Sequence, residues 1–222
     1  MRVNSGSMEA NALRVLPAEA LDTGQMDRLA EIYAQAFPPD LRVPLAELAE
    51  DSPRDRLLVA VDNAEPVGFA ALRLLVRVHW VFLRYYAVAA DRRRTGLGRA
   101  FWDLTLQQLA DDRWPPRIAF EVEDPAEAVL DAGEHAIRRG RINFWVSCGA
   151  GQLTVPGYVM PALTAIGQSE PMILMSAGPA GTTRSSSELA ALVRAIFTDH
   201  YGLAADDQLL VTALSSIKPN QP

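Results

Sequence analysis

The sequence is poor in several residue types, and each scarcity excludes a class of protein. Cys148 is the only cysteine among 222 residues, so no disulfide can form within the chain, and we expect a reducing, cytoplasmic location. The three histidines stand far apart, at positions 79, 135 and 200, with no cysteine at metal-ligand spacing, so no metal site is predicted. Lys218 is the only lysine and belongs to no Gly-Lys-Ser/Thr motif, which excludes a Walker-type nucleotide loop.

Long apolar runs and excess positive charge are also lacking. No apolar stretch reaches membrane-spanning length, and the N-terminus lacks the basic-then-apolar order of a signal peptide, so no membrane contact is expected. The net charge of -6 argues against nucleic acid as the main partner and is compatible with a cationic amine substrate. We expect residues 1–7 to be a vector remnant or disordered, residues 8–203 to form one domain that includes a C-terminal helix, and residues 204–222 to be a tail.

What the sequence does contain is an alternation of short strands and helices with an apolar stripe. Apolar residues that alternate with polar ones predict strands, and apolar residues that recur about every 3.6 positions predict helices. Strands are predicted at 12–16, 56–62, 67–76, 78–88, 117–123, 152–155 and 171–177, and helices at 23–37, 44–50, 97–111, 134–148 and 185–201. This order predicts an α/β domain built around a central mixed sheet.

The most informative segment joins a strand to a helix through two glycines. An apolar strand ends at Val88, the motif Arg93-x-x-Gly96-x-Gly98 follows, and an amphipathic helix continues to residue 111. The glycines let a ligand approach the backbone, and the first amides of a helix point outward without partners, which is a phosphate-binding arrangement. The alternatives are an ordinary connection with solvated arginines and a Rossmann site, and the Gly-x-Gly-x-x-Gly spacing of the latter is absent.

Arg93-x-x-Gly96-x-Gly98 behind a hydrophobic strand resembles the acyl-CoA pyrophosphate loop of the GNAT N-acetyltransferases. Residues 142–150 (INFWVSCGA) are similar to the late helix of that family, and the resemblance extends over residues 11–178. It implies an α/β fold with a splayed, mixed, mostly antiparallel sheet flanked by helices, and acetyl-CoA as the co-substrate in the gap. It implies that the acetyl group passes to the primary amine of a small molecule by direct attack on the thioester. The resemblance assigns acetyl-CoA binding to Ala87, Val88, Arg93, Arg94, Thr95, Gly96, Leu97, Gly98 and Arg99.

The strand at 117–123 carries two carboxylates that are candidates for the general base. Side chains alternate along a strand, so Glu121 and Glu123 share one face. Acyl transfer to an amine needs a group that removes the ammonium proton, and proximity and burial raise the pKa of a carboxyl group toward neutrality. We expect Glu121, nearer the strand centre, to be the base, with Glu123 second. A solvated strand face with structural carboxylates is an equal alternative.

The acid that protonates the leaving thiolate is less evident. In the late helix of the family a tyrosine often follows a phenylalanine, but here Trp145 follows Phe144, and an indole N–H does not give up its proton near neutral pH. We expect Tyr158, which Pro156 and Gly157 frame, to replace that tyrosine. The alternative is that Tyr158 only plugs a loop.

Because Trp145 stands in place of the tyrosine that the family often has, a second function is also possible, namely a catalytically weak acyl-CoA-binding sensor or scaffold of the same fold. The loop at 152–171 and the first helical pair are expected to line the acceptor pocket, with Phe37 and Tyr158 among the lining residues. The sequence does not name the amine or the acyl length, and it leaves a homodimer open.

Overall fold

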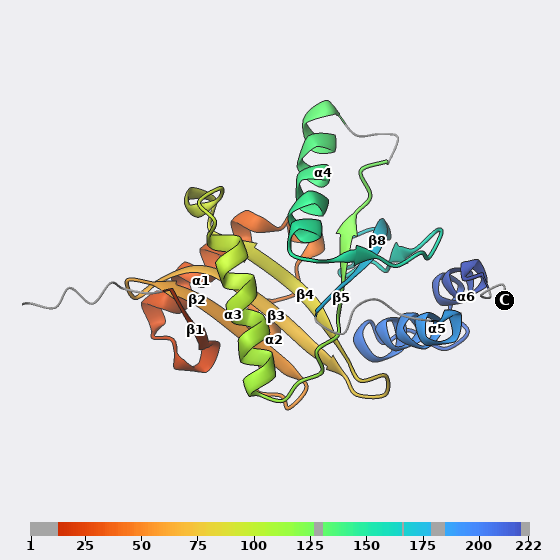
Figure 1. Ribbon diagram of the computed structural model, residues 1–222, viewed down its shortest axis with the longest axis horizontal. Coiled ribbons are helices and arrows are strands. Elements are labelled where there is room, and N and C mark those ends of the chain that lie inside the picture. The colour runs from red at the N-terminus through yellow and green to blue at the C-terminus, as the bar shows by residue number, and fades with distance from the viewer. Residues whose placement is uncertain (1–12, 127–130, 166, 179–184, 219–222) are drawn as a thin grey trace, which may run out of the picture.

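The computed structural model describes residues 13–126, 131–165, 167–178 and 185–218. Its centre is a sheet with the strand order β1-β2-β3-β4-β5-β8-β6, and β7 pairs with β8 (Figure 1). The strands are β1 (Arg14–Pro17), β2 (Asp55–Asp62), β3 (Glu65–Leu75), β4 (Trp80–Val88), β5 (Ile118–Glu123), β6 (Gly151–Gln152), β7 (Val159–Met160) and β8 (Glu170–Ala177). Among the described strands only β4 and β5 run parallel, so the predicted mixed, mostly antiparallel sheet is confirmed.

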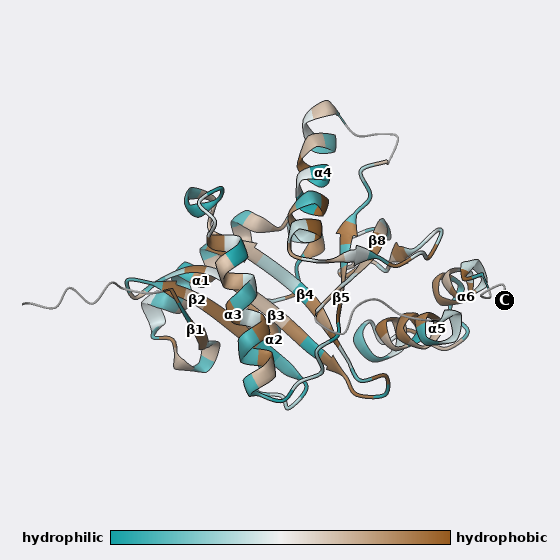
Figure 2. Ribbon diagram, viewed as in Figure 1, coloured by the Kyte–Doolittle hydropathy of each residue, from teal (hydrophilic) through white to brown (hydrophobic). Residues whose placement is uncertain are grey.

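Helices cover both faces of this sheet (Figure 1). They are α1 (Thr23–Ala36), α2 (Leu45–Leu48), α3 (Leu97–Asp111), α4 (Ala132–Ser147), α5 (Ser186–Ala195), the π-helical turn η4 (Ile196–His200) and α6 (Gln208–Ser216), with short 3-10 turns at Ala18–Ala20, Pro39–Leu41 and Ala90–Arg92. One face packs against α3 and α4. The other face packs against α1 and α2 beside β2–β4, and against α5, η4 and α6 beside β5 and β8. Figure 2 shows hydrophobic residues along the central strands and on α5.

The pairing between β4 and β5 stops partway along both strands. Val81 pairs with Ile118 and Leu83 with Phe120, and beyond Leu83 and Phe120 the two strands share no further pair among their described residues. The remaining part of β4, residues 84–88, therefore has β3 on one edge and an opening on the other. This divergence is the splay that the family resemblance implies, and we call it the opening.

A β-bulge in β4 sits where the opening begins. Leu72 of β3 pairs with Leu83, and the next residue back, Ala71, pairs with Tyr85, so Arg84 is an extra residue in β4. A bulge bends its strand and re-aims the side chains beside it. Arg84 and Tyr85, neighbours in sequence, accordingly both line the same cavity.

Within the segment predicted as a tail, residues 204–222, the structure has the helix α6 at Gln208–Ser216. Leu210 and Ala213 are fully buried beside α5, and the Asp207 side chain caps the helix by accepting a hydrogen bond from the Leu209 amide. The predicted strand at 152–155 is present only as the two-residue β6 at Gly151–Gln152, and the expected loop at 152–171 also contains the two-residue strand β7.

Residues 1–7, the predicted vector remnant, lie outside the described residues, and a single domain over 8–203 stays a prediction. In the described parts of the chain, the helices are all too short or too polar to cross a membrane.

Candidate active site

The predicted phosphate loop lies at the N-terminus of α3 in a conformation that needs glycine. Gly96 has φ +88° at the N-cap of α3, and no side chain caps the helix. A Cβ atom on Gly96 would meet nothing within 4 Å, whereas one on Gly98 would lie 3.3 Å from the Phe144 ring. Gly96 thus leaves open space over the first amides of the helix, and Gly98 lets α3 approach α4 closely. Uncapped amides beside open space are able to bind an anion.

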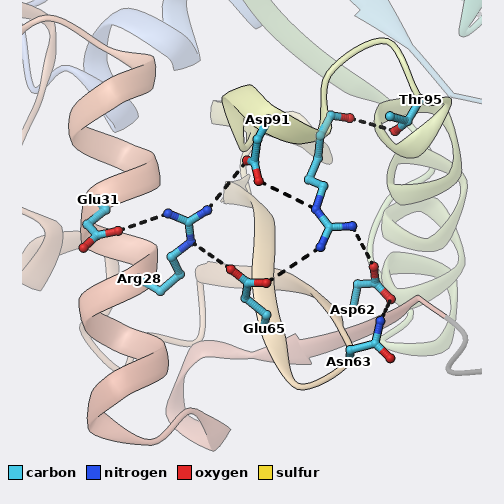
Figure 3. Close-up of polar contacts among 8 residues, drawn as sticks. Arg28, Glu31, Asp62, Asn63, Glu65, Asp91 and Thr95 are labelled. Carbon is cyan, nitrogen blue, oxygen red and sulfur yellow. Dashed lines mark hydrogen bonds and ion pairs between the residues drawn. The ribbon is translucent and has the colours of Figure 1, made fainter.

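Arg92 connects the loop to neighbouring elements, and Figure 3 labels its partners Asp62, Glu65 and Thr95. Its guanidinium lies 3.2 Å from Asp62 and 3.7 Å from Glu65, both on the β2–β3 hairpin, and its carbonyl accepts a 2.7 Å hydrogen bond from the Thr95 hydroxyl. Glu65 also lies 3.5 Å from Arg28 of α1. These contacts connect the loop to two other elements, so Arg92 has a structural role here.

The remaining arginines of the loop are exposed. The Arg93 Nε donates to the Val88 carbonyl at 3.3 Å. Arg99 donates to the Ser147 carbonyl at the end of α4 and pairs with Asp103 at 3.4 Å. Arg94 has φ +63°, and no polar partner of its side chain is found within the described residues. Positive charge therefore surrounds the open amides, and Arg94 is the loop arginine whose side chain has no polar partner among the described residues.

The end of β4 supplies the next part of the site. Ala87 pairs with Phe69 and Val88 with Gly68, so β3 occupies one edge of this segment while its other edge faces the opening. Gly68 is required here, because a Cβ atom on it would lie 2.7 Å from the Ala87 carbonyl oxygen. Behind these residues, the Tyr86 hydroxyl donates to the Gly98 carbonyl at 2.6 Å and holds the start of α3 against β4.

Glu121 lies in the wall of a cavity of about 270 Å³ at the opening. The Tyr158 hydroxyl donates to its Oε1 at 2.6 Å, and the Tyr201 hydroxyl donates to its Oε2. Burial raises the pKa of Glu121 to about 7, although the hydrogen bonds from the two tyrosines lower it. Glu121 as a whole is half-buried and borders the cavity. A carboxyl group with such a pKa can gain or lose a proton near neutral pH.

Glu123 lines the same cavity, two residues further along β5. It forms an ion pair with Arg141 of α4. The structure therefore brings the two candidate carboxylates to one cavity but gives them different partners. Hydroxyl groups contact Glu121 and a guanidinium contacts Glu123.

Tyr158 lies behind Glu121. It is 2% exposed, does not line the cavity, and packs edge-on against Phe197 with ring centroids 5.4 Å apart. Burial raises its pKa well above the ordinary value, and the charge of Glu121 adds to this. Within the described residues its hydroxyl contacts only Glu121, so the Tyr158 side chain is brought to the candidate base and not to the cavity.

Tyr201 and His200 reach the cavity from the C-terminal segment, and the sequence analysis missed both. The Tyr201 amide donates to the carbonyl of Ile196, five residues earlier, at 3.1 Å, which closes η4. This wider turn lets both His200 and Tyr201 line the cavity. Burial lowers the pKa of His200 well below its ordinary value, and Arg84 adds to this, so His200 is neutral. The apolar stripe of this helix gave no signal of a π-helical turn.

Arg84 was also missed. Its side chain is 4% exposed, lies in the cavity wall, and pairs with Glu47 of α2 at 2.8 Å. The predicted pocket residue Phe37 lines the cavity as well. Trp145 does not: it is buried in the core, with its ring 4.4 Å from Phe120 and 5.1 Å from Tyr86.

Solved structures of acetyltransferases share this fold. A GNAT-family acetyltransferase from Bacteroides thetaiotaomicron is 21% identical, with 86% of this chain and 99% of that chain covered and a TM-score of 0.65. An aminoglycoside 6'-N-acetyltransferase complexed with coenzyme A is 19% identical, with 74% and 96% covered and a TM-score of 0.56. The ribosomal-protein-S18-alanine N-acetyltransferase from Escherichia coli is 20% identical, with 78% and 97% covered and a TM-score of 0.52. At these identities the likeness concerns the fold.

A search of curated proteins found no match to this sequence. The sequence model of the acetyltransferase (GNAT) family matches residues 26–131, which include the glycine loop, both strands of the opening, and Glu121. Tyr158 and Tyr201 lie C-terminal to the matched range. Residues 26–131 therefore carry a GNAT acetyltransferase domain, and the shared chemistry of that family is acyl-CoA-dependent acyl transfer.

Proposed function

We propose that this protein transfers an acetyl group from acetyl-CoA to the primary amine of a small molecule, by direct attack of the deprotonated amine on the thioester. One observation carries the proposal: Glu121, with a pKa of about 7, borders a cavity at the opening between β4 and β5. A base whose pKa lies near the working pH is well matched to removing a proton from an ammonium group.

The proposed acetyl-CoA site extends from the N-terminus of α3 to the end of β4. The uncapped amides at Gly96, the open space above this residue and the exposed side chains of Arg93 and Arg94 suit a pyrophosphate. The free edge of β4 at Ala87 and Val88 suits an extended chain that pairs with backbone amides. The coenzyme A in the aminoglycoside 6'-N-acetyltransferase of the same fold supports this assignment.

In the proposed reaction Glu121 accepts a proton from the ammonium group, and the neutral amine nitrogen then attacks the thioester carbonyl. The C–N bond forms and the C–S bond breaks. Tyr201 donates its proton to the departing sulfur and recovers one from Glu121, to which it is hydrogen-bonded. The amine loses two protons in all, one of which ends on the thiol and the other in solvent.

We assign the donor role to Tyr201, although the sequence predicts Tyr158 for it. Both hydroxyls contact Glu121, but only Tyr201 lines the cavity. For Tyr158 to reach the sulfur, its hydroxyl would have to leave both the carboxylate and its buried position. Tyr158 is then a positioning residue, since it fixes Oε1 of Glu121.

Two variants test the base. Glu121→Gln is expected to lower kcat/KM for amine acetylation, followed as CoA release, by on the order of 100-fold while calorimetry finds acetyl-CoA affinity unchanged. Glu123→Gln, two residues along the same strand, is the matched control and should retain activity. Loss only in Glu123→Gln would make Glu123 the base.

The second candidate is a catalytically weak acyl-CoA-binding sensor or scaffold, which Trp145 favours because it stands where the late helix of the family often has tyrosine. Acetyl-CoA binding without CoA release across a panel of primary amines would establish this reading. A cytoplasmic location and a homodimer stay predictions.

A further inference from the structure

Most of the residues that line the cavity are apolar. Apolar residues reach it from α1, the 3-10 turn that follows, β4, the loop around β7 and the C-terminal segment, and examples are Phe37, Phe82, Met160 and Leu203. The acetyl end of the co-substrate must share this space of about 270 Å³, so the room that remains suits a compact acceptor.

The hydroxyl groups in this wall already have partners. The Tyr85 hydroxyl donates to the Leu41 carbonyl at 3.1 Å and accepts from the Val43 amide at 3.3 Å. The Tyr201 hydroxyl donates to Glu121. An acceptor with several hydroxyl groups would therefore find few free partners, and burying an unpaired hydroxyl group is unfavourable.

The charged groups in the wall are compensated, with one exception. Arg84 pairs with Glu47 at 2.8 Å, and Glu123 pairs with Arg141. His200 is neutral because burial lowers its pKa. Among the ionisable residues that line the described cavity, Glu121 is left without a cationic partner, since its contacts are the two tyrosine hydroxyls. The wall thus offers one site for one ammonium group.

We propose that the acceptor is a compact, apolar primary amine with a single positive charge, such as an alkylamine or arylalkylamine, and this rests on the proposed function. A second ammonium group would lose its hydration without gaining an unpaired counter-charge, because the other two carboxylates of the wall, Glu47 and Glu123, are already paired with arginines. A polyamine or an amino sugar is therefore a poor acceptor, even though an aminoglycoside acetyltransferase shares the fold.

Matched amines test the proposal on the wild-type chain with acetyl-CoA. We expect kcat/KM to be at least about tenfold higher for n-pentylamine than for 1,5-diaminopentane, and for 2-phenylethylamine than for glucosamine. Equal or better turnover of the diamine or the amino sugar overturns the acceptor class and leaves acetyl transfer intact. If acetyl-CoA binds but none of these amines is acetylated, the proposed function falls, and the acceptor class with it.

A variant pair tests the role of wall charge. Leu163 lines the cavity from the loop after β7 and is partly exposed, so Leu163→Asp adds a second carboxylate there. It should shift the ratio of kcat/KM toward 1,5-diaminopentane by about tenfold. Ala165→Asp adds the same charge to an exposed site on the same loop that does not line the cavity, and should leave the ratio unchanged. An unchanged ratio in a folded Leu163→Asp variant contradicts the proposal, and the amine comparison decides the matter if that variant does not fold.

Discussion

The two tyrosines on Glu121 offer a matched pair of perturbations. Tyr158→Phe removes the hydrogen bond to Oε1 of Glu121, and Tyr201→Phe removes the one to Oε2. Each substitution deletes a single oxygen atom. Both bonds stabilise the ionised carboxylate, so losing either raises the pKa of Glu121. Only Tyr201 borders the cavity, so only Tyr201→Phe also removes the proposed proton donor.

The size of the effect follows from the strength of such bonds. A hydrogen bond to a charged group contributes about 1.5–3 kcal/mol, and about 1.4 kcal/mol corresponds to one pKa unit. Each variant should therefore move the pKa of Glu121 from about 7 upward by about one to two units. At pH 7 the ionised fraction then falls from about one half to about one tenth or less, and activity falls with it.

The pH profile of kcat/KM, followed by CoA release, separates the two roles. In Tyr158→Phe the acid limb moves to higher pH and the wild-type plateau returns in alkaline buffer. In Tyr201→Phe the limb moves similarly, but the plateau stays lower by on the order of 100-fold because the donor is missing. Equal plateaus would refute the donor role of Tyr201, and a plateau loss confined to Tyr158→Phe would restore the sequence-based assignment. An unmoved limb in both would show that the tyrosines do not set the pKa of Glu121.

Three further outcomes are expected. Gly96→Asp should weaken acetyl-CoA binding by at least about tenfold in calorimetry. Asparagine tolerates the φ of +88° at this position and adds no charge, so Gly96→Asn should weaken binding much less. Equal losses in the two variants would argue against an anion bound at this position. Glu121 in the folded chain keeps its proton up to about pH 7, whereas its ordinary pKa is 4.5, so the stability it contributes is complete below about pH 4.5 and lost as the pH rises through 7. The thermal midpoint of the wild type, relative to Glu121→Gln, should fall across that window, and a flat difference would contradict the raised pKa. Trp145→Phe should lower the thermal midpoint and leave the pH profile unchanged, because Trp145 lies in the core, and a displaced acid limb would place it in catalysis.

Local patterns in the sequence were sufficient to place the loop and the strand face. Two glycines, an apolar strand before them and an amphipathic helix after them depend only on neighbouring residues, and the structure has α3 starting at Leu97, as predicted. Alternation along β5 likewise predicted that Glu121 and Glu123 share one face, since that rule follows from strand geometry alone. The family resemblance added the splay, which periodicity does not contain.

Only the tertiary structure decided what surrounds Glu121. The bulge at Arg84 depends on how β4 aligns with β3, and a register shift of one residue leaves no mark on the sequence of either strand. Tyr158 and Tyr201 come from positions 37 and 80 residues beyond Glu121, and a π-helical turn brings the second of them to the cavity. Trp145, which occupies the position where the family often has a tyrosine, is a core residue. The pKa of Glu121 is set by burial and by these distant hydroxyls, so it is a property of the packed chain and not of any segment of the sequence.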